Sequence, residues 1–112
     1  MSDSTNYRLE MTGSGFDPEF ALFRLFRDVP EAKNYFDFHG KPTGNGYDWR
    51  SLEEDMRAFS MTMPEVTFLF TEYGTYGNEA FEFRHYFRAG RYAHVEPVVV
   101  KTWPEFTDDL LG

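Results

Sequence analysis

The clearest pattern of apolar and polar positions in this chain lies between residues 47 and 73. Five large apolar side chains recur there at steps of three and four residues, which places them on one face of an α-helix. They are Trp49, Leu52, Met56, Phe59 and Met63. Pro64 has no amide hydrogen to donate, so we expect the helix to end before it. Residues 66–71 then alternate, which is typical of a β-strand with a buried face.

The polar positions of this predicted helix carry mostly charged side chains and face away from the apolar stripe. Ser51 and Glu54 have the spacing of a capping box, in which each side chain accepts a hydrogen bond from the other residue's backbone amide, and Asp48 is an alternative cap. Glu53, Glu54 and Asp55 are consecutive, so their carboxylates point in different directions around the helix. Catalysis by paired carboxylates requires two acids about 5 to 10 Å apart, and a solvated helix face is the simpler interpretation.

Shorter patterns predict the elements of the first half of the chain. Alternation over residues 7–11 predicts a strand, and the Asp17-Pro18 pair predicts the start of a helix, because proline suits the first helical turn. The apolar residues of that helix cover more than one stripe, so we expect it to be mostly buried. They are Phe20, Leu22, Phe23, Leu25 and Phe26. A further short strand is predicted at residues 35–39.

The second half of the chain has the alternation of a β-hairpin. Residues 81–88 alternate without interruption, and Ala89-Gly90 supplies a tight turn in which glycine can adopt a positive φ. The return strand is predicted over residues 91–100, where Pro97 indicates an edge position or a bulge because it cannot donate to a neighbouring strand. A short helix is predicted within residues 105–111.

These elements indicate one domain, residues 1–112, of the α+β class. We expect a two-layer sandwich in which a mainly antiparallel sheet of four to five strands is covered on one face by two helices, with a short C-terminal helix. At 112 residues the chain is long enough for one core. We expect residues 1–5 to be frayed and residues 104–112 to form an acidic C-terminal tail.

Composition narrows the class of protein. Hydrophobic residues make up 41% and aromatic residues 20% of the chain, with 13 Phe, which excludes intrinsic disorder and predicts a dense core. Cysteine is absent, which excludes disulfides and thiolate chemistry and fits a cytoplasmic protein. The N-terminal segment lacks the pattern of a signal peptide and no apolar run is long enough to span a membrane, so we expect neither secretion nor membrane insertion.

The net charge of −8 and the pI near 4.7 indicate the kind of partner that suits this protein. Negative potential repels nucleic-acid phosphates and anionic lipids, so direct binding to nucleic acid or membranes is disfavoured and a basic macromolecular partner is favoured. The excess acid is spread along the chain rather than gathered in one tail, and solubility alone is the simpler explanation of it.

The histidines are the main candidates for a metal site. His39, His85 and His94 lie on predicted strands. His85 and His94 can pair across the hairpin, and with Glu72 or Glu96 they could bind a metal ion. The simpler interpretation is that His85 lies in a phenylalanine-rich face and that His94 caps it, bonded to a backbone group, so we predict no metal site.

Motifs for nucleotide binding and acyl transfer are missing from the sequence. The Gly-rich loop at residues 40–46 contains a Gly-Lys pair but lacks the spacing of a phosphate-binding loop. Ser51 and Ser60 have no His or Asp at a spacing that would indicate a serine nucleophile, and the motif G-x-S-x-G is absent. We therefore predict that the protein is not an enzyme, has no catalytic residues and binds no cofactor.

Part of the sequence, covering about residues 47–92, follows a pattern that is shared with other small proteins. The residues that carry it are Tyr47-Asp48-Trp49, Glu53, Glu54-Asp55-Met56, Phe59-Ser60, Pro64-Glu65-Val66, Phe68, Glu72-Tyr73-Gly74 and Tyr86-Phe87-Arg88-Ala89-Gly90-Arg91. This pattern resembles small ferredoxin-like proteins and domains of phages, prophages and plasmids, the YubB-like domains among them. The chain departs from the family at the turn 73–76, which is not acidic, and at Arg91, where the relatives have Lys.

The resemblance implies a ferredoxin-like fold and a mobile-element context, in which small acidic proteins include anti-CRISPR proteins and other inhibitors of bacterial defence. We therefore expect a non-enzymatic binding protein in the cytoplasm of the bacterial host that occludes a basic surface on a nucleic-acid-binding defence complex. Charges on the predicted helix would steer association and exposed aromatic residues would anchor it. The residues expected to bind the partner are Glu53, Glu54, Asp55, Arg57, Tyr76 and Trp103.

A small regulatory or single-stranded nucleic-acid-binding domain is the alternative expectation. Aromatic and basic residues on the final hairpin form a locally positive patch. They are Arg84, Tyr86, Arg88, Arg91 and Tyr92. Aromatic side chains on an open sheet can stack bases, although the overall negative charge opposes phosphate binding. A ladder of cross-strand pairs on a solvated face explains the same residues.

Overall fold

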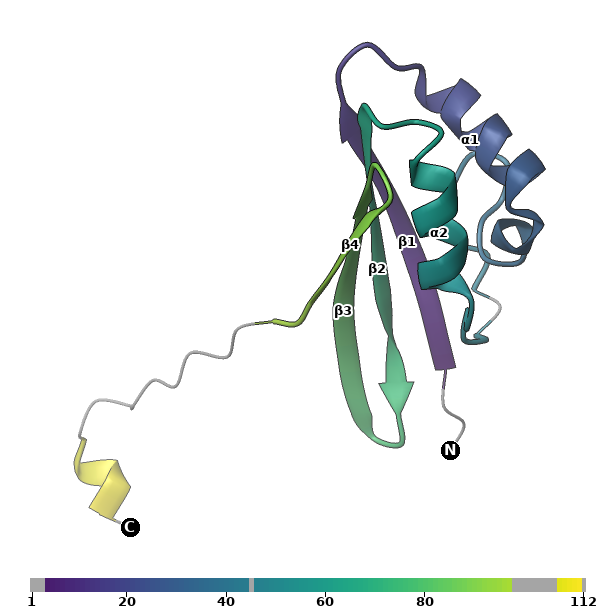
Figure 1. Ribbon diagram of the computed structural model, residues 1–112. Helices are drawn as coiled ribbons and strands as arrows, with labels where there is room; N and C mark the ends of the chain where they lie inside the picture. The colour runs from purple at the N-terminus through teal and green to yellow at the C-terminus, as the bar shows by residue number, and fades with distance from the viewer. Residues whose placement is uncertain (1–3, 45, 98–106, 112) are drawn as a thin grey trace.

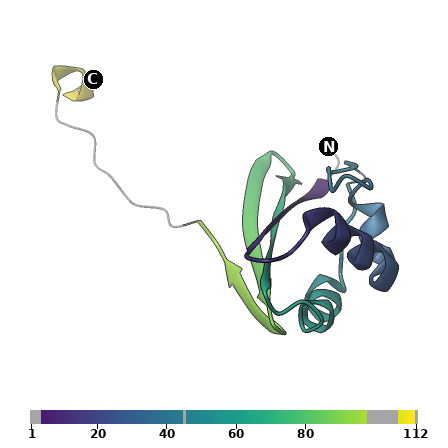
Figure 2. The same ribbon diagram turned by 90° about the horizontal axis from the view of Figure 1, so that it is seen from above.

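The computed structural model describes residues 4–44, 46–97 and 107–111. Within these ranges the chain forms a four-stranded antiparallel sheet with two α-helices on one face (Figure 1). Viewed from above, the sheet makes one layer and both helices lie in a second layer beside it (Figure 2). The expected α+β class, with an antiparallel sheet and two helices against it, is confirmed.

The order of the elements gives the sheet a simple topology. The elements are β1 (Ser4–Gly13), α1 (Pro18–Asp28), the 3₁₀ helix η1 (Pro30–Asn34), α2 (Leu52–Ser60), β2 (Val66–Tyr76), β3 (Glu79–Arg88), β4 (Arg91–Val95) and the 3₁₀ helix η2 (Asp108–Leu111). Across the sheet the order is β1-β2-β3-β4. Both α-helices are inserted between β1 and β2, whereas the ferredoxin-like arrangement interleaves two β-α-β units. The ferredoxin-like part of the prediction is therefore not confirmed.

The strand predicted at residues 35–39 does not form. Tyr35 and Phe36 are consecutive and both buried, whereas neighbouring residues of a strand point to opposite faces. They follow η1 directly, and Phe36 makes an isolated bridge to Pro42. An irregular segment therefore supplies two adjacent rings to the core.

The apolar stripe around α2 lies against the sheet, as expected. All five of its side chains are buried, although α2 itself spans Leu52–Ser60 and ends earlier than the pattern predicts. The ring of Phe59 lies 5.6 Å from that of Phe68, and the ring of Trp49 lies 5.7 Å from that of Phe70. Burial of aromatic rings of this size supplies much of the driving force for folding.

An aromatic cluster fixes the residues just before α2. The ring of Tyr35 stacks on that of Trp49 at 5.0 Å, and Tyr7 from β1 meets both rings edge-on. The Tyr7 hydroxyl donates to the Asp48 carboxylate at 3.0 Å and accepts from the Trp49 amide at 2.8 Å. The Tyr35 hydroxyl donates to the Asp48 carbonyl at 3.1 Å. The start of α2 is thereby tied to β1.

Tyr7→Phe is expected to destabilise the fold by about 1–3 kcal/mol, because the Asp48 carboxylate and the Trp49 amide each lose a hydrogen-bond partner. Burial raises the pKa of Tyr7 above its ordinary value of 10.0. The folded state therefore keeps this phenol protonated while the unfolded chain ionises, so its contribution to stability is complete below pH 10 and declines above it. Urea unfolding at neutral and alkaline pH measures both effects. If wild type and Tyr7→Phe lose the same amount of stability at alkaline pH, the predicted effect of the Tyr7 pKa is contradicted.

Helix α1 begins where the sequence predicts but is not mostly buried. The Asp17 side chain accepts a hydrogen bond from the Glu19 amide at 3.0 Å, and Pro18 is the first helical residue. The buried residues form one stripe: Ala21, Leu22 and Leu25. Phe20 and Phe23 are 54% and 61% exposed. The prediction of a mostly buried helix is therefore wrong, because α1 packs against its neighbours with one face and leaves the other in solvent.

Two predictions concern the ends of the chain. Residues 4 and 5 are paired with β2 as part of β1, so the predicted fraying of residues 1–5 is wrong for them. Residues 1–3, the last part of the predicted return strand (98–100) and residues 104–106 and 112 of the predicted tail lie outside the described residues. Within that tail, Asp108–Leu111 forms the short helix η2.

Candidate functional site

A groove beside α2 is a candidate binding site of this structure. It lies between the segment 28–31, where α1 ends, and one side of α2, and its volume is about 670 Å³. Its lining residues are Asp28, Val29, Pro30, Glu31, Ser51, Glu54, Asp55, Ala58, Phe59 and Thr62. Four of these described residues are carboxylates and none is a lysine or arginine, so we refer to it as the acidic groove.

The acidic groove combines an apolar floor with charged rims. Phe59 in its lining is buried, whereas Glu31 and Glu54 are exposed. A hydrogen bond from Arg27, at 2.8 Å, lowers the pKa of Asp28, so this carboxylate is ionised at neutral pH. An apolar floor below separated carboxylates fits a long cationic side chain, whose aliphatic stem contacts the floor while its head group meets the rim.

Asp55 is held in the groove by two residues that precede α2. Its carboxylate accepts hydrogen bonds from the Ser51 hydroxyl at 2.7 Å and from the Trp49 indole at 3.1 Å. Ser51 makes no capping hydrogen bond. The predicted capping box with Glu54 is therefore wrong, because the Ser51 hydroxyl binds a side chain one turn ahead instead of a backbone amide.

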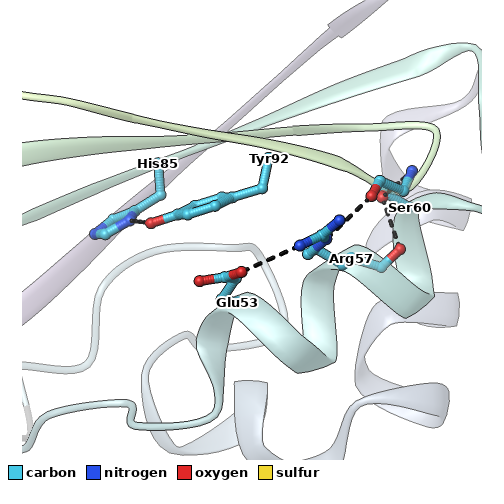
Figure 3. Close-up of polar contacts among 6 residues, drawn as sticks. Glu53, Arg57, Ser60, His85 and Tyr92 are labelled. Carbon is cyan, nitrogen blue, oxygen red and sulfur yellow. Dashed lines mark hydrogen bonds and ion pairs between the residues drawn. The ribbon is translucent and has the colours of Figure 1, made fainter.

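Glu53 and Arg57 lie on a different side of α2, where they fasten the helix to the β3–β4 hairpin (Figure 3). Arg57 donates to the Gly90 carbonyl at 3.2 Å and to the Glu53 carboxylate at 3.2 Å. The Ser60 hydroxyl accepts from the Gly90 amide at 2.9 Å and donates to the Arg57 carbonyl at 3.1 Å. Both predicted partner-binding residues therefore make contacts within the fold and do not line the acidic groove.

One of the two predicted aromatic anchors, Tyr76, does not line the groove. Tyr76 is 75% exposed at the end of β2. The turn from β2 to β3 lies away from the two helices in Figure 1. Trp103 lies outside the described residues, so its role stays a prediction.

The second predicted surface is the sheet face that no helix of the described residues covers (Figures 1 and 2). We call it the uncovered face. The register of β3 and β4 places four of the five predicted residues there: Arg84, Tyr86, Arg88 and Arg91. Tyr92 pairs with the buried Phe87 and stacks on it at 4.9 Å. The placement of Tyr92 in this patch is therefore wrong, because alternation along β4 turns its ring toward the helices.

Residues from β1 and β2 extend the uncovered face. The Arg8 guanidinium lies 5.1 Å from the centre of the Tyr73 ring in a cation–π contact. Arg8 and Arg84 are both cross-strand partners of Thr71, which is only 4% exposed because these long side chains flank it. The sequence did not reveal Arg8 and Tyr73 as part of this surface, since only the pairing of β1 with β2 brings them to it.

A polar chain links Glu72, His85 and Tyr92 on the helix-facing side of the sheet. The His85 Nε2 atom lies 2.9 Å from the Glu72 carboxylate, and Nδ1 lies 2.7 Å from the Tyr92 hydroxyl. The neutral ring satisfies both contacts by donating to Glu72 and accepting from Tyr92. Burial raises the pKa of Tyr92, which opposes its use as a phenolate nucleophile.

The histidine pair predicted from the hairpin forms, but its surroundings differ from those expected. His85 and His94 are cross-strand partners with rings 5.1 Å apart. The His85 ring contacts the side chains of Glu72 and Tyr92. Glu96 is exposed beyond β4, and His39 lies exposed in a turn instead of on a strand. In the described part of the chain no group of three or more His, Asp or Glu side chains could hold a metal ion.

Comparison of the chain with models of protein families, with curated proteins and with solved structures finds no match. None of the helices in the ranges described above is long and apolar enough to cross a membrane. Proposals for function therefore depend on the surfaces of the molecule and on the pattern of its sequence.

Proposed function

We propose that this protein is a non-enzymatic binding protein whose acidic groove docks on a basic surface of a larger partner. The observation that carries this proposal is the groove of about 670 Å³ in which carboxylates surround an apolar floor. A protruding lysine or arginine of the partner lays its aliphatic stem on Phe59 and Ala58 and its head group between Glu31 and Glu54.

The distribution of charge supports this orientation of the complex. Residues 14–65, which include both α-helices, carry ten carboxylates and six lysines or arginines. The helical layer therefore presents negative potential around the acidic groove. Such potential accelerates encounter with a basic partner, and its effect weakens as salt is added.

The resemblance to ferredoxin-like proteins of phages and plasmids supplies the biological context of the proposal. In that context the partner is a host defence complex that uses a basic surface to bind nucleic acid. The protein then acts in the bacterial cytoplasm as an anti-CRISPR-like inhibitor, by occupying the surface that nucleic acid requires. Steric and electrostatic occlusion of this kind requires no catalytic residue or cofactor.

Binding of the immobilised protein to purified CRISPR and other nucleic-acid-binding defence complexes tests the proposal. We expect salt-sensitive binding to one of these complexes, together with improved phage plating on cells that carry it. Failure to bind any complex, with unchanged plating, would remove the role in defence inhibition.

A second function, binding of single-stranded nucleic acid, is favoured by the uncovered face. Four arginines and two glutamates lie on it, so it is locally basic on a chain of net charge −8. These residues are Arg8, Arg84, Arg88, Arg91, Glu10 and Glu82. The partly exposed rings of Tyr73 and Tyr86 offer stacking surfaces for bases beside these cations.

Arg88→Ala combined with Arg91→Ala is expected to weaken binding of a fluorescent single-stranded oligonucleotide by about tenfold and to reduce its salt dependence, because two phosphate contacts are lost. Fluorescence anisotropy over a series of salt concentrations measures both quantities. Arg24→Ala with Arg50→Ala removes the same charge from the helical layer and serves as the control. Equal binding by the two double variants would exclude the uncovered face as the nucleic-acid site.

A further inference from the structure

Helix α1 exposes an aromatic stripe that its own packing uses only at Phe26, which packs against the core. Its outward positions lie at helical spacing around Phe23. They are Glu19, Phe20, Phe23 and Arg27, and the partly buried Phe26 lies at the edge of the stripe. Phe20 and Phe23 are 54% and 61% exposed, and Phe38 is 78% exposed. Contiguous exposed rings on a small domain mark an interaction surface.

A hollow of about 490 Å³ lies against this stripe. Its lining residues are Glu19, Phe23, Phe26, Arg27, Lys33 and Phe38. Three of them are phenylalanines, and the charged ones have both signs. The hollow therefore suits an aromatic side chain that arrives with charges of both signs around it, which is what the outward face of α1 itself presents.

We propose that α1 is the interface of a two-fold symmetric dimer of this chain, in which the two α1 helices lie antiparallel and cross at Phe23. Phe23 stands midway between Glu19 and Arg27 in the sequence. The two-fold axis therefore brings Glu19 of each copy level with Arg27 of the other copy. It also brings Phe20 level with Phe26 of the other copy, so aromatic residues meet between the charged ends.

Charge decides how the two helices pair. In the antiparallel arrangement each end of the contact joins a carboxylate and a guanidinium, whereas a parallel pair would set Glu19 against Glu19 and Arg27 against Arg27. Arg27 binds Asp28 through Nε and one terminal nitrogen, and its guanidinium has further N–H donors for a second carboxylate. A stripe that is complementary to itself is what a two-fold interface requires, so a second copy fits it better than an unrelated partner.

Sedimentation equilibrium of the full chain, over concentrations from micromolar to millimolar, tests this proposal independently of the proposed function. The mass is expected to rise from 13.2 kDa toward twice that value. Phe23→Ser is expected to weaken dimerisation at least about tenfold and to leave the circular dichroism spectrum unchanged, because this ring is largely exposed. Tyr76→Ser, at a residue 75% exposed on the sheet, is the matched control and is expected to dimerise like wild type.

A charge swap tests the antiparallel arrangement. Glu19→Arg and Arg27→Glu each set like charges against one another, so each alone is expected to weaken the dimer severalfold, and the double variant is expected to restore it. If the mass of the wild-type protein stays at 13.2 kDa at all concentrations, the proposal is overturned. This result would also be expected if α1 bound only some other protein. Phe23→Ser that dimerises like wild type overturns it as well, and a double variant that is not restored overturns the antiparallel pairing.

Discussion

Trp49→Ala is expected to lower the free energy of unfolding by about 3–5 kcal/mol, the usual cost of removing a buried aromatic ring. Trp49 is 3% exposed, and its ring stacks on Tyr35 at 5.0 Å. Domains of this kind are stabilised by roughly 5–15 kcal/mol, so the substitution removes a large part of the total. It also removes a hydrogen bond to Asp55 and thereby loosens one wall of the acidic groove.

Urea unfolding followed by circular dichroism measures this cost. Phe59→Ala is expected to show a similar loss, because Phe59 is 3% exposed and packs on Phe68. Tyr76→Ala removes a comparable ring from an exposed position and is expected to change stability by less than about 0.5 kcal/mol. A near-neutral effect of Trp49→Ala would show that the aromatic cluster before α2 is not part of the core.

Glu31→Lys combined with Glu54→Lys is expected to weaken binding of an arginine-rich peptide about thirtyfold, which corresponds to about 2 kcal/mol. The two residues line the acidic groove from different elements, Glu31 from η1 and Glu54 from α2, so the reversal replaces attraction of a bound cation with repulsion from both elements. Isothermal titration calorimetry at low ionic strength measures the change, because added salt screens exposed charges.

The control for this variant must separate the groove from the total charge. Glu65→Lys with Glu79→Lys reverses two exposed carboxylates outside the groove. Because each reversal adds two charges, both double variants move the net charge from −8 to −4. The control variant is expected to bind the peptide nearly as well as wild type. Equal weakening in the two variants would mean that the peptide responds to net charge alone.

Local patterns in the sequence were sufficient to predict α2, its buried stripe and the β3–β4 hairpin. The steps between Trp49 and Met63 match the helical repeat, and the alternation of 81–88 matches the pleat of a strand, so neighbours in sequence determine both. The same reasoning failed for the burial of α1, although not for its start, and for residues 35–39. Whether Phe23 is covered, or whether Tyr35 and Phe36 can share one core, depends on segments far away in the chain.

For the candidate site as well, some residues could be predicted from their neighbours in sequence, whereas others depend on distant segments of the chain. Glu54 and Asp55 could be found from the charge of the helix, but the opposite wall of the groove, with Asp28 and Glu31, comes from a segment that only the tertiary fold brings near. Helical periodicity also could not show that Arg57 is engaged by the hairpin. Pairing of distant strands, in turn, determines which residues share the uncovered face.

The central claim, that the acidic groove is the binding surface, is tested most directly by amide chemical-shift mapping of the isotope-labelled protein during titration with an arginine-rich peptide. We predict that the largest shift changes fall on residues 28–31 and 54–62, on the two walls of the groove, and disappear in the Glu31→Lys, Glu54→Lys variant. Shift changes spread evenly over all acidic residues, or concentrated on another surface, would contradict the account.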